Sequence, residues 1–290
     1  MTSLFLVVAA FVGGALNAVA GGGSFIVLPA LLFAGVPPVA ANATTTLALW
    51  PGSLASAVAY RREAAVARHW LMRLGGVSLI GGFLGGLLLV RTSDASFLRL
   101  LPWLMLLAAV TFTFGTPFTA RLRTLGRVAP APRRATTGAT SAPPPGSRDP
   151  HPAPGTAAPA PGTPDAASPG PHPPPLWSLP MQLAIATYGG YFGGGIGIMM
   201  LASLAIAGMT NMHEMNGVKS VLAVAINGVA LAEFIVSGTV AWGPGMLMVA
   251  GGIAGGYAGA SLARRFSGRV VRGFVTAVAW TMTIYFFSWR

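Results

Sequence analysis

Two glycine triplets, each followed by a polar cluster, are the residues of this sequence best suited to bind a charged solute. The triplets are Gly21, Gly22 and Gly23, with Ser24 directly after them, and Gly193, Gly194 and Gly195, with Gly197 close behind. Consecutive glycines permit a helix to break and a new helix to start, and the free amides at that start carry the positive end of the helix dipole. Each triplet therefore predicts an anion site at a helix start. The alternative is that the glycines only let neighbouring helices pack closely, as small residues do in membranes.

Amide, hydroxyl and ammonium groups head the segment that follows each triplet. They are Asn42, Thr44, Thr45 and Thr46 in the first half of the chain, and Asn216, Lys219 and Ser220 in the second half. Donors of this kind beside a broken segment are what the dehydration of a small anion requires, so all of them except Thr44 join the predicted substrate-binding residues. Two other roles stay open, because asparagine is a good helix N-cap and threonine hydroxyls also bond back to the preceding turn.

Lys219 is the sharpest single candidate. A lysine at the centre of a bilayer costs about 2.5–3.5 kcal/mol on insertion scales, so a lysine that is kept there usually has a partner. An anionic substrate would be that partner. The alternative is a position near the interface, from which the long side chain reaches the headgroups.

Glu233 is the only carboxylate inside a predicted membrane segment. A dry setting favours the neutral form of a carboxylate, which makes Glu233 a candidate for proton coupling. Its position close to the segment end at Ser237 is also compatible with the membrane interface. The sequence has no cysteine and its few histidines are scattered, so we predict no metal site, no cofactor and no catalytic residue.

The composition places these residues in a membrane. Hydrophobic residues make up 53% of the chain and charged residues only 8%, whereas about a quarter of an average soluble domain is charged. Residues 4–118 and 176–287 form two apolar blocks with several windows long enough to span a bilayer as a helix. The net charge of +12 comes from arginines at segment edges, which fits membrane topology better than nucleic-acid binding. An all-α polytopic membrane protein is predicted, with the lipid bilayer as its partner.

Hydropathy divides each block into four segments. They fall near residues 4–33, 40–60, 72–91 and 96–118, and near residues 179–209, 216–238, 243–263 and 270–288. The first is expected to stay as a membrane segment, because it lacks the basic leading region of a signal peptide. The domain division is therefore 1–120, a Pro/Ala/Gly-rich linker expected to be disordered over 121–176, and 177–290.

The two blocks echo one another. "AGGGSFIVLPALLFAG" is answered by "FGGGIGIMMLASLAIAG", "NATTTLALWPG" by "NGVKSVLAVAING", and "GGFLGGLLL" by "GGIAGGYAG". About eight transmembrane helices are predicted, in two homologous four-segment repeats whose first segments are broken. An internal repeat with interrupted segments at matching positions is typical of secondary transporters.

The arginine clusters conflict with simple counting of eight spans. The cluster that starts at Arg61 and the start of the linker fall on one side, and the cluster from Arg264 to Arg272 falls on the other. Either one broken segment is re-entrant or the two halves are inverted relative to each other. The sequence leaves these alternatives and the orientation of the chain open.

Both blocks resemble one known family. The first contains "NAVAGGGSFIVLPALLFAGVPPVAANATTTLALWPGSLASAVAYRR" and the second contains "MNGVKSVLAVAINGVA" and "GGIAGGYAGASLARR". In combination these motifs resemble the sulfite exporter TauE/SafE family of bacterial permeases for sulfite, sulfonates and related organosulfur anions. The resemblance implies an inner-membrane permease with a site shared between the repeats. It does not extend to the long linker.

A secondary transporter for a small, sulfur-containing anion is therefore the leading hypothesis, and a homo-oligomer is compatible with it. The chain has no nucleotide-binding P-loop, so direct ATP coupling within it is not expected. The alternatives are a passive anion channel or a membrane partner subunit, and, less favoured, a membrane-embedded lipid enzyme, for which one intramembrane carboxylate is too few.

Overall fold

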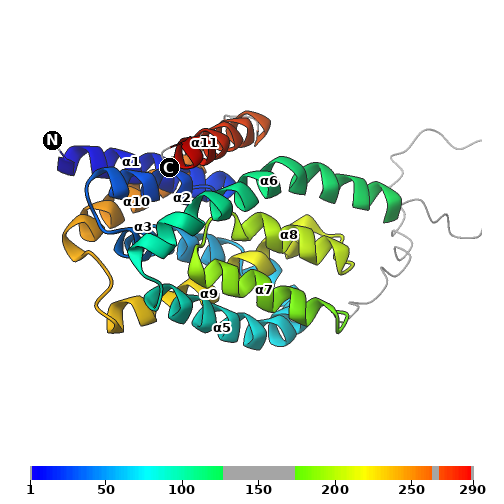
Figure 1. The fold of residues 1–290 in the computed structure, drawn as a ribbon. Helices are drawn as coiled ribbons and strands as arrows, with labels where there is room; N and C mark the ends of the chain where they lie inside the picture. The colour runs from blue at the N-terminus through cyan, green and yellow to red at the C-terminus, as the bar shows by residue number, and fades with distance from the viewer. Residues whose placement is uncertain (1, 127–173, 263–267, 289–290) are drawn as a thin grey trace, which may run out of the picture.

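The computed structural model describes residues 2–126, 174–262 and 268–288, and these residues form eleven helices without a β-strand (Figure 1). The helices of the first half are α1 (Thr2–Ala20), α2 (Ser24–Phe33), α3 (Pro38–Ala59), α4 (Arg61–Val66), α5 (Arg68–Val90) and α6 (Asp94–Gly126). Those of the second half are α7 (Ser178–Tyr191), α8 (Ile196–Ile206), α9 (Met212–Val236), α10 (Trp242–Leu262) and α11 (Gly268–Ser288). Helix α6 continues past the predicted start of the linker at residue 121, and most of that linker lies outside the described residues.

Both predicted breaks are present, and the glycine triplets cause them. Helix α1 ends before Gly21, which has a φ of +77°, and α7 gives way to Gly193 and Gly195, with φ of +78° and +80°. L-residues with a side chain rarely adopt this left-handed conformation, whereas glycine does so without a steric penalty. The chain can therefore reverse direction at each triplet.

Each broken segment folds back on itself as a helical hairpin. A Cβ added at Gly13 of α1 would lie 3.1 Å from the carbonyl oxygen of Gly23, and one added at Gly23 would lie 2.9 Å from the Cβ of Asn17. A Cβ at Gly189 of α7 would lie 3.0 Å from Cγ1 of Ile196 in α8. The second helix of each hairpin thus packs beside the end of the first helix instead of extending it.

Six helices, α3, α5, α6, α9, α10 and α11, run between the two ends of the bundle (Figure 1). At the end that holds both termini, the ring of Phe33 in α2 lies 5.6 Å from that of Tyr285 in α11. At the opposite end, which we call the linker end, α6 ends and α7 begins, and Arg73 Nη1 of α5 donates to the Pro174 carbonyl over 3.4 Å. We call the end that holds both termini the termini end. The hairpin α1–α2 starts and finishes at the termini end, and α7–α8 starts and finishes at the linker end.

The hairpins bear on the predicted number of spans and on the conflict among the arginines. Because neither hairpin carries the chain from one end to the other, α11 begins at the linker end, with Arg269 and Arg272 in its first turns. Helix α4, with Arg61 and Arg62, connects α3 to α5 at this same end. Each broken segment returns to the end of the bundle at which it starts, and the two halves run in opposite directions.

The two halves pack against each other reciprocally. Helix α1 packs on α10 and α7 packs on α5, while α3 packs on α10 and α9 packs on α5. Helices α6 and α11 contact each other, as do α3 and α9 at the centre. Such an exchange of equivalent contacts is expected of two units related by an approximate two-fold axis.

Glycines permit the closest of these approaches. A Cβ at Gly82 of α5 would lie 2.7 Å from the Ile226 carbonyl oxygen of α9, and one at Gly252 of α10 would lie 2.6 Å from the Ala48 carbonyl oxygen of α3. The motifs "GGFLGG" and "GGIAGG" therefore make equivalent helix contacts in the two halves.

The interpretation of two asparagines as helix caps is wrong. Helix α3 begins at Pro38, because proline suits the first helical position, so Asn42 lies inside the helix. Helix α9 is capped by Asn211, whose side chain accepts a hydrogen bond from the His213 amide over 3.0 Å, so Asn216 also lies inside its helix.

Within the described residues, three stretches are long and apolar enough to cross a membrane: α5, residues Asp94–Gly115 of α6, and α9. Shorter apolar helices cover Thr2–Ala18, Ser24–Phe33, Ile196–Ile206 and Gly273–Ser288. The all-helical fold and these apolar elements are those of a membrane protein.

Candidate anion-binding site

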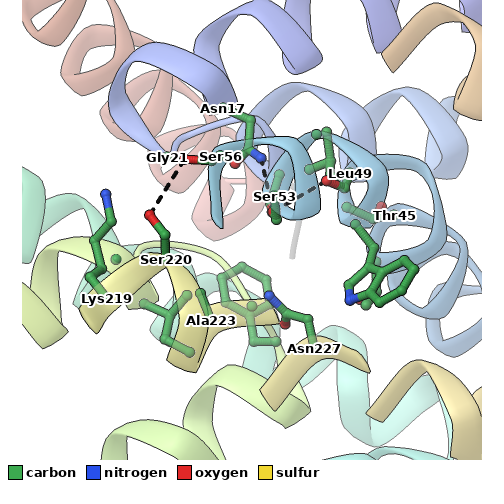
Figure 2. A pocket seen from close by; sticks show the side chains of 18 residues that line it. Asn17, Gly21, Thr45, Leu49, Ser53, Ser56, Lys219, Ser220, Ala223 and Asn227 are labelled. Carbon is green, nitrogen blue, oxygen red and sulfur yellow. Dashed lines mark hydrogen bonds between the residues drawn. The ribbon is translucent and has the colours of Figure 1, made fainter. Parts of the chain in front are cut away.

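A pocket of about 80 Å³ lies where the two hairpin tips meet the central helices α3 and α9 (Figure 2). One water needs about 10–15 Å³ of such space, so the pocket has room for several water molecules or a small solute. The predicted site residues that line it come from both halves: Gly21, Ser24, Thr45, Thr46, Gly193, Lys219 and Ser220. Irregular backbone at membrane depth is tolerated where it borders a cavity of this kind.

The other triplet glycines lie beside the pocket and serve packing. A Cβ at Gly22 would meet the side chain of Val275 in α11, and one at Gly194 would lie 2.6 Å from the ring of Phe192. Gly23 packs against α1, and a Cβ at Gly195 would lie 3.0 Å from Ala108 in α6. The close-packing interpretation therefore applies to these glycines, whereas Gly21 and Gly193 border the pocket.

Neither asparagine of the predicted site lines the pocket. Asn42 is 1% exposed, and its Nδ2 donates to the Tyr191 carbonyl over 2.8 Å, which ties α3 to the end of α7. Asn216 donates to the Met212 carbonyl of its own helix over 2.9 Å. Asn42 therefore helps to pack the second hairpin tip, and Asn216 lies outside the pocket.

Lys219 is the single charged side chain among the residues that line the pocket, and it is the only lysine of the sequence. Its carbon stem crosses the first turn of α8, where a Cβ at Gly197 would lie 3.5 Å from its Cδ. No ion pair or hydrogen bond joins its ammonium to any residue that the structure describes. Ile196 and Gly197, in the first turn of α8, also line the pocket, and the amides of a first helical turn have no partner within the helix. An unpaired cation beside a helix start favours an anion.

The threonine hydroxyls are turned toward their own helix. Thr45 Oγ1 donates to the Ala41 carbonyl over 2.8 Å, and Thr46 Oγ1 donates to the Asn42 carbonyl over 3.2 Å, as the back-bonding alternative predicts. In this state, the threonines offer the pocket an acceptor oxygen. Donors for an anion then have to come from Lys219, the helix amides and the other polar side chains of the pocket.

Five lining residues with polar side-chain atoms were missed by reasoning from the sequence: Asn17, Trp50, Ser53, Ser56 and Asn227. Four of them follow the helical period from residues that were found. Trp50 lies one turn after Thr46, Ser53 and Ser56 continue that face of α3, and Asn227 lies two turns after Lys219 on α9. Asn17 carried no such signal, because only the fold-back of the first hairpin brings it to the tip.

Two hydrogen bonds cross the pocket from α3 to α9. Trp50 Nε1 donates to the Val224 carbonyl over 3.2 Å, and the hydroxyls of Ser56 and Ser220 are 3.4 Å apart. Figure 2 shows the second of these, together with the bond from Asn17 Nδ2 to Ser53 Oγ over 3.5 Å. These contacts join the two halves across the pocket.

Glu233, the predicted proton-coupling residue, lies outside the pocket, near the far end of α9. It faces Gly86 of α5, and its Oε2 is buried without a hydrogen-bond partner in the described part of the chain. Its position is thus an interface between the two halves, about 14 residues along α9 from Lys219, or roughly 20 Å at 1.5 Å per residue.

A bundle of apolar helices in which two broken elements enclose a polar pocket is the architecture of a membrane transporter. The chain belongs to the Sulfite exporter TauE/SafE family, which matches residues 6–286.

Two relatives support this class. A "Probable membrane transporter protein" of Haemophilus influenzae is 26% identical over 94% of this chain and 89% of the relative. A "Probable membrane transporter protein ORF9" of a Sinorhizobium species is 26% identical over 97% of this chain and 90% of the relative. No solved structure matches the chain.

Proposed function

We propose that this protein is a secondary transporter of the bacterial inner membrane that moves a small anion, a sulfite, sulfonate or related organosulfur compound. The observation that carries the proposal is the unpaired ammonium of Lys219 in a pocket between two broken helices. The family name supports a sulfur oxyanion as the solute. Because the family and both relatives are named as transporters, transport is favoured over a lipid enzyme.

We further propose an inverted repeat in which each half contributes one re-entrant hairpin and three full spans. The reciprocal packing of the halves supports this arrangement. Each repeat still consists of the four predicted segments, but its first segment enters and leaves the membrane on the same side. Since the arginines of α4 and of the first turns of α11 share the linker end, the positive-inside rule favours a cytoplasmic linker end.

A carrier is favoured over a passive channel because α3 and α9 are bonded to each other across the pocket. In a carrier, these contacts break on one side at a time, as one half rocks against the other. A channel would require a continuous path past them.

Anion uptake into proteoliposomes tests the proposal, with labelled sulfite and ethanesulfonate as probes. We expect saturable uptake by the wild type, at least a tenfold loss for Lys219→Gln, and partial retention for Lys219→Arg, because the arginine keeps the charge. Arg91→Gln, which changes an exposed arginine at the end of α5, is the matched control and should behave as wild type. Non-saturable flux would favour the channel, and unchanged uptake by Lys219→Gln would remove the lysine from the site.

A further inference from the structure

The pocket has two chemically different ends along α9. At one end, Lys219 lies beside Gly197, and its neighbour Ser220 contacts Ser56. At the other end, Asn227 lies beside the second hairpin tip, where a Cβ at Gly193 would be 3.7 Å from its Oδ1. Asn227 lies eight positions after Lys219 on α9, which corresponds to about 12 Å at 1.5 Å per residue. Figure 2 shows the two side chains well apart on the same wall of the pocket.

The approximate two-fold relation between the halves allows the residues of α3 and α9 that line the pocket to be compared position by position. Positions on α3 and α9 that both line the pocket correspond in pairs: Thr45 with Lys219, Thr46 with Ser220, Leu49 with Ala223, and Ser53 with Asn227. The charge is therefore present on one half only. The equivalent of Lys219 is a threonine, whose hydroxyl is already bonded to its own helix.

The Asn227 side chain borders the pocket and is partly buried, and no hydrogen bond links its amide to the described part of the chain. Its counterpart Ser53, in contrast, accepts from Asn17 and lies 3.3 Å from the Leu49 carbonyl, to which it donates. An amide supplies two donors and one acceptor oxygen, and it carries no charge.

We propose that Asn227 is a specificity-determining residue that binds an uncharged polar group of the solute while Lys219 holds the anionic group. The inference rests on the proposed function and deepens it. A solute that engages both ends is an elongated organic anion with a hydroxyl or amide several atoms from its acidic group. An inorganic oxyanion is too short to reach both, so it binds at the Lys219 end alone. The anionic group points toward the linker end, because α9 begins there.

Discrimination between two matched probes tests the proposal. Pentane-1-sulfonate and 5-hydroxypentane-1-sulfonate differ by one hydroxyl at the end opposite the sulfonate, and each is measured as a competitor of labelled sulfite in proteoliposomes. The wild type should bind the hydroxylated probe roughly tenfold more tightly, the gain expected of one well-made hydrogen bond. Asn227→Leu, which keeps the branched shape of the side chain, should lose this preference while its affinity for pentane-1-sulfonate and sulfite stays within about twofold.

Asn216→Leu is the control, because this asparagine lies on the same helix but bonds to its own backbone outside the pocket. It should keep the tenfold preference. Equal binding of the two probes by the wild type, or equal loss of both probes in Asn227→Leu, would overturn the role of Asn227 while sulfite uptake that depends on Lys219 still supports the proposed function. Absence of any anion competition or uptake in the wild type would overturn both.

Discussion

At the scale of single residues, neighbouring side chains of one polar cluster have opposite tasks. Thr44 Oγ1 accepts a hydrogen bond from the Ala241 amide over 3.0 Å and so fixes the chain just before α10. Thr45, the next residue, donates to its own helix and borders the pocket. The sequence "TTT" alone could not separate these tasks, because helical rotation sends the two side chains in different directions and only the position of α10 gives Thr44 its partner.

Because Thr44 and Thr45 have different hydrogen-bond partners, replacing each of them by valine gives a matched pair of variants. Thr44→Val leaves the Ala241 amide without its acceptor, which we expect to cost about 1–3 kcal/mol of stability. Thr45→Val removes only a bond from a hydroxyl to a carbonyl that is already used by the helix, so its unfolding temperature should stay close to that of the wild type. Thermal unfolding of the detergent-purified proteins measures both. An equal loss of stability in the two variants would contradict the assigned partners.

Glu233 is another single residue whose role can be tested separately. A carboxylate oxygen that is buried without a partner, at an interface between α5 and α9, suits a group that takes up and releases a proton as the halves move. We expect Glu233→Gln to keep anion exchange at equal pH on both sides but to lose the acceleration caused by a pH gradient. Counterflow and gradient-driven uptake in the same proteoliposomes separate these two activities. Unaltered gradient-driven uptake would exclude proton coupling at this residue.

At the scale of the elements, glycines decide how closely helices approach. The motif "GGFLGG" of α5 places Gly82 against the backbone of α9, where a side chain has no room, whereas Gly76 of the same helix has nothing within 4 Å of its Cβ position. Sequence analysis identified the matching glycine motifs of the two halves. It could not tell which glycines contact a neighbour, because that depends on the partner helix.

Two alanine variants follow from this contrast. Gly82→Ala forces α5 and α9 apart, since its Cβ would lie 2.7 Å from the Ile226 carbonyl oxygen, and we expect a loss of about 1–3 kcal/mol, typical of overpacking. Gly76→Ala has free space and should leave the stability unchanged or slightly raised, because alanine is the better helix former. Urea or thermal unfolding in detergent compares them. Equal stability of the two variants would show that the contact between α5 and α9 has room for a Cβ at position 82.

At the scale of the whole molecule, the sequence indicated the helical membrane class, both breaks and the correspondence between the halves. It left a re-entrant course of a broken segment as one of two alternatives. A glycine triplet permits both a kink and a reversal, and the choice depends on long-range packing, such as that of Gly13 against the start of α2. Predicted site residues therefore line the pocket at its hairpin tips and at Lys219, whereas the place of Asn17 and Asn227 in it required the assembled fold.

The chain has no cysteine, so single cysteines report the topology directly. With re-entrant hairpins, Ala65→Cys and Thr210→Cys share the linker side, and Ser93→Cys and Ser237→Cys share the termini side; all four positions are exposed. An impermeant maleimide added to intact cells should label the second pair and spare the first. Eight simple spans would place the two members of each pair on opposite sides, so labelling of only one member of each pair would contradict the inverted hairpins.

The central claim is that a solute anion meets the sole lysine of the chain between the two hairpin tips. Amine-reactive labelling of the purified protein, read by mass spectrometry, measures this contact, because the N-terminal amine and Lys219 are the only amines present. We predict that Lys219 is labelled in chloride-free buffer and that ethanesulfonate slows this labelling severalfold without changing that of the N-terminal amine. A Lys219 that stays unlabelled without the anion, or that reacts at the same rate with and without it, would contradict the account.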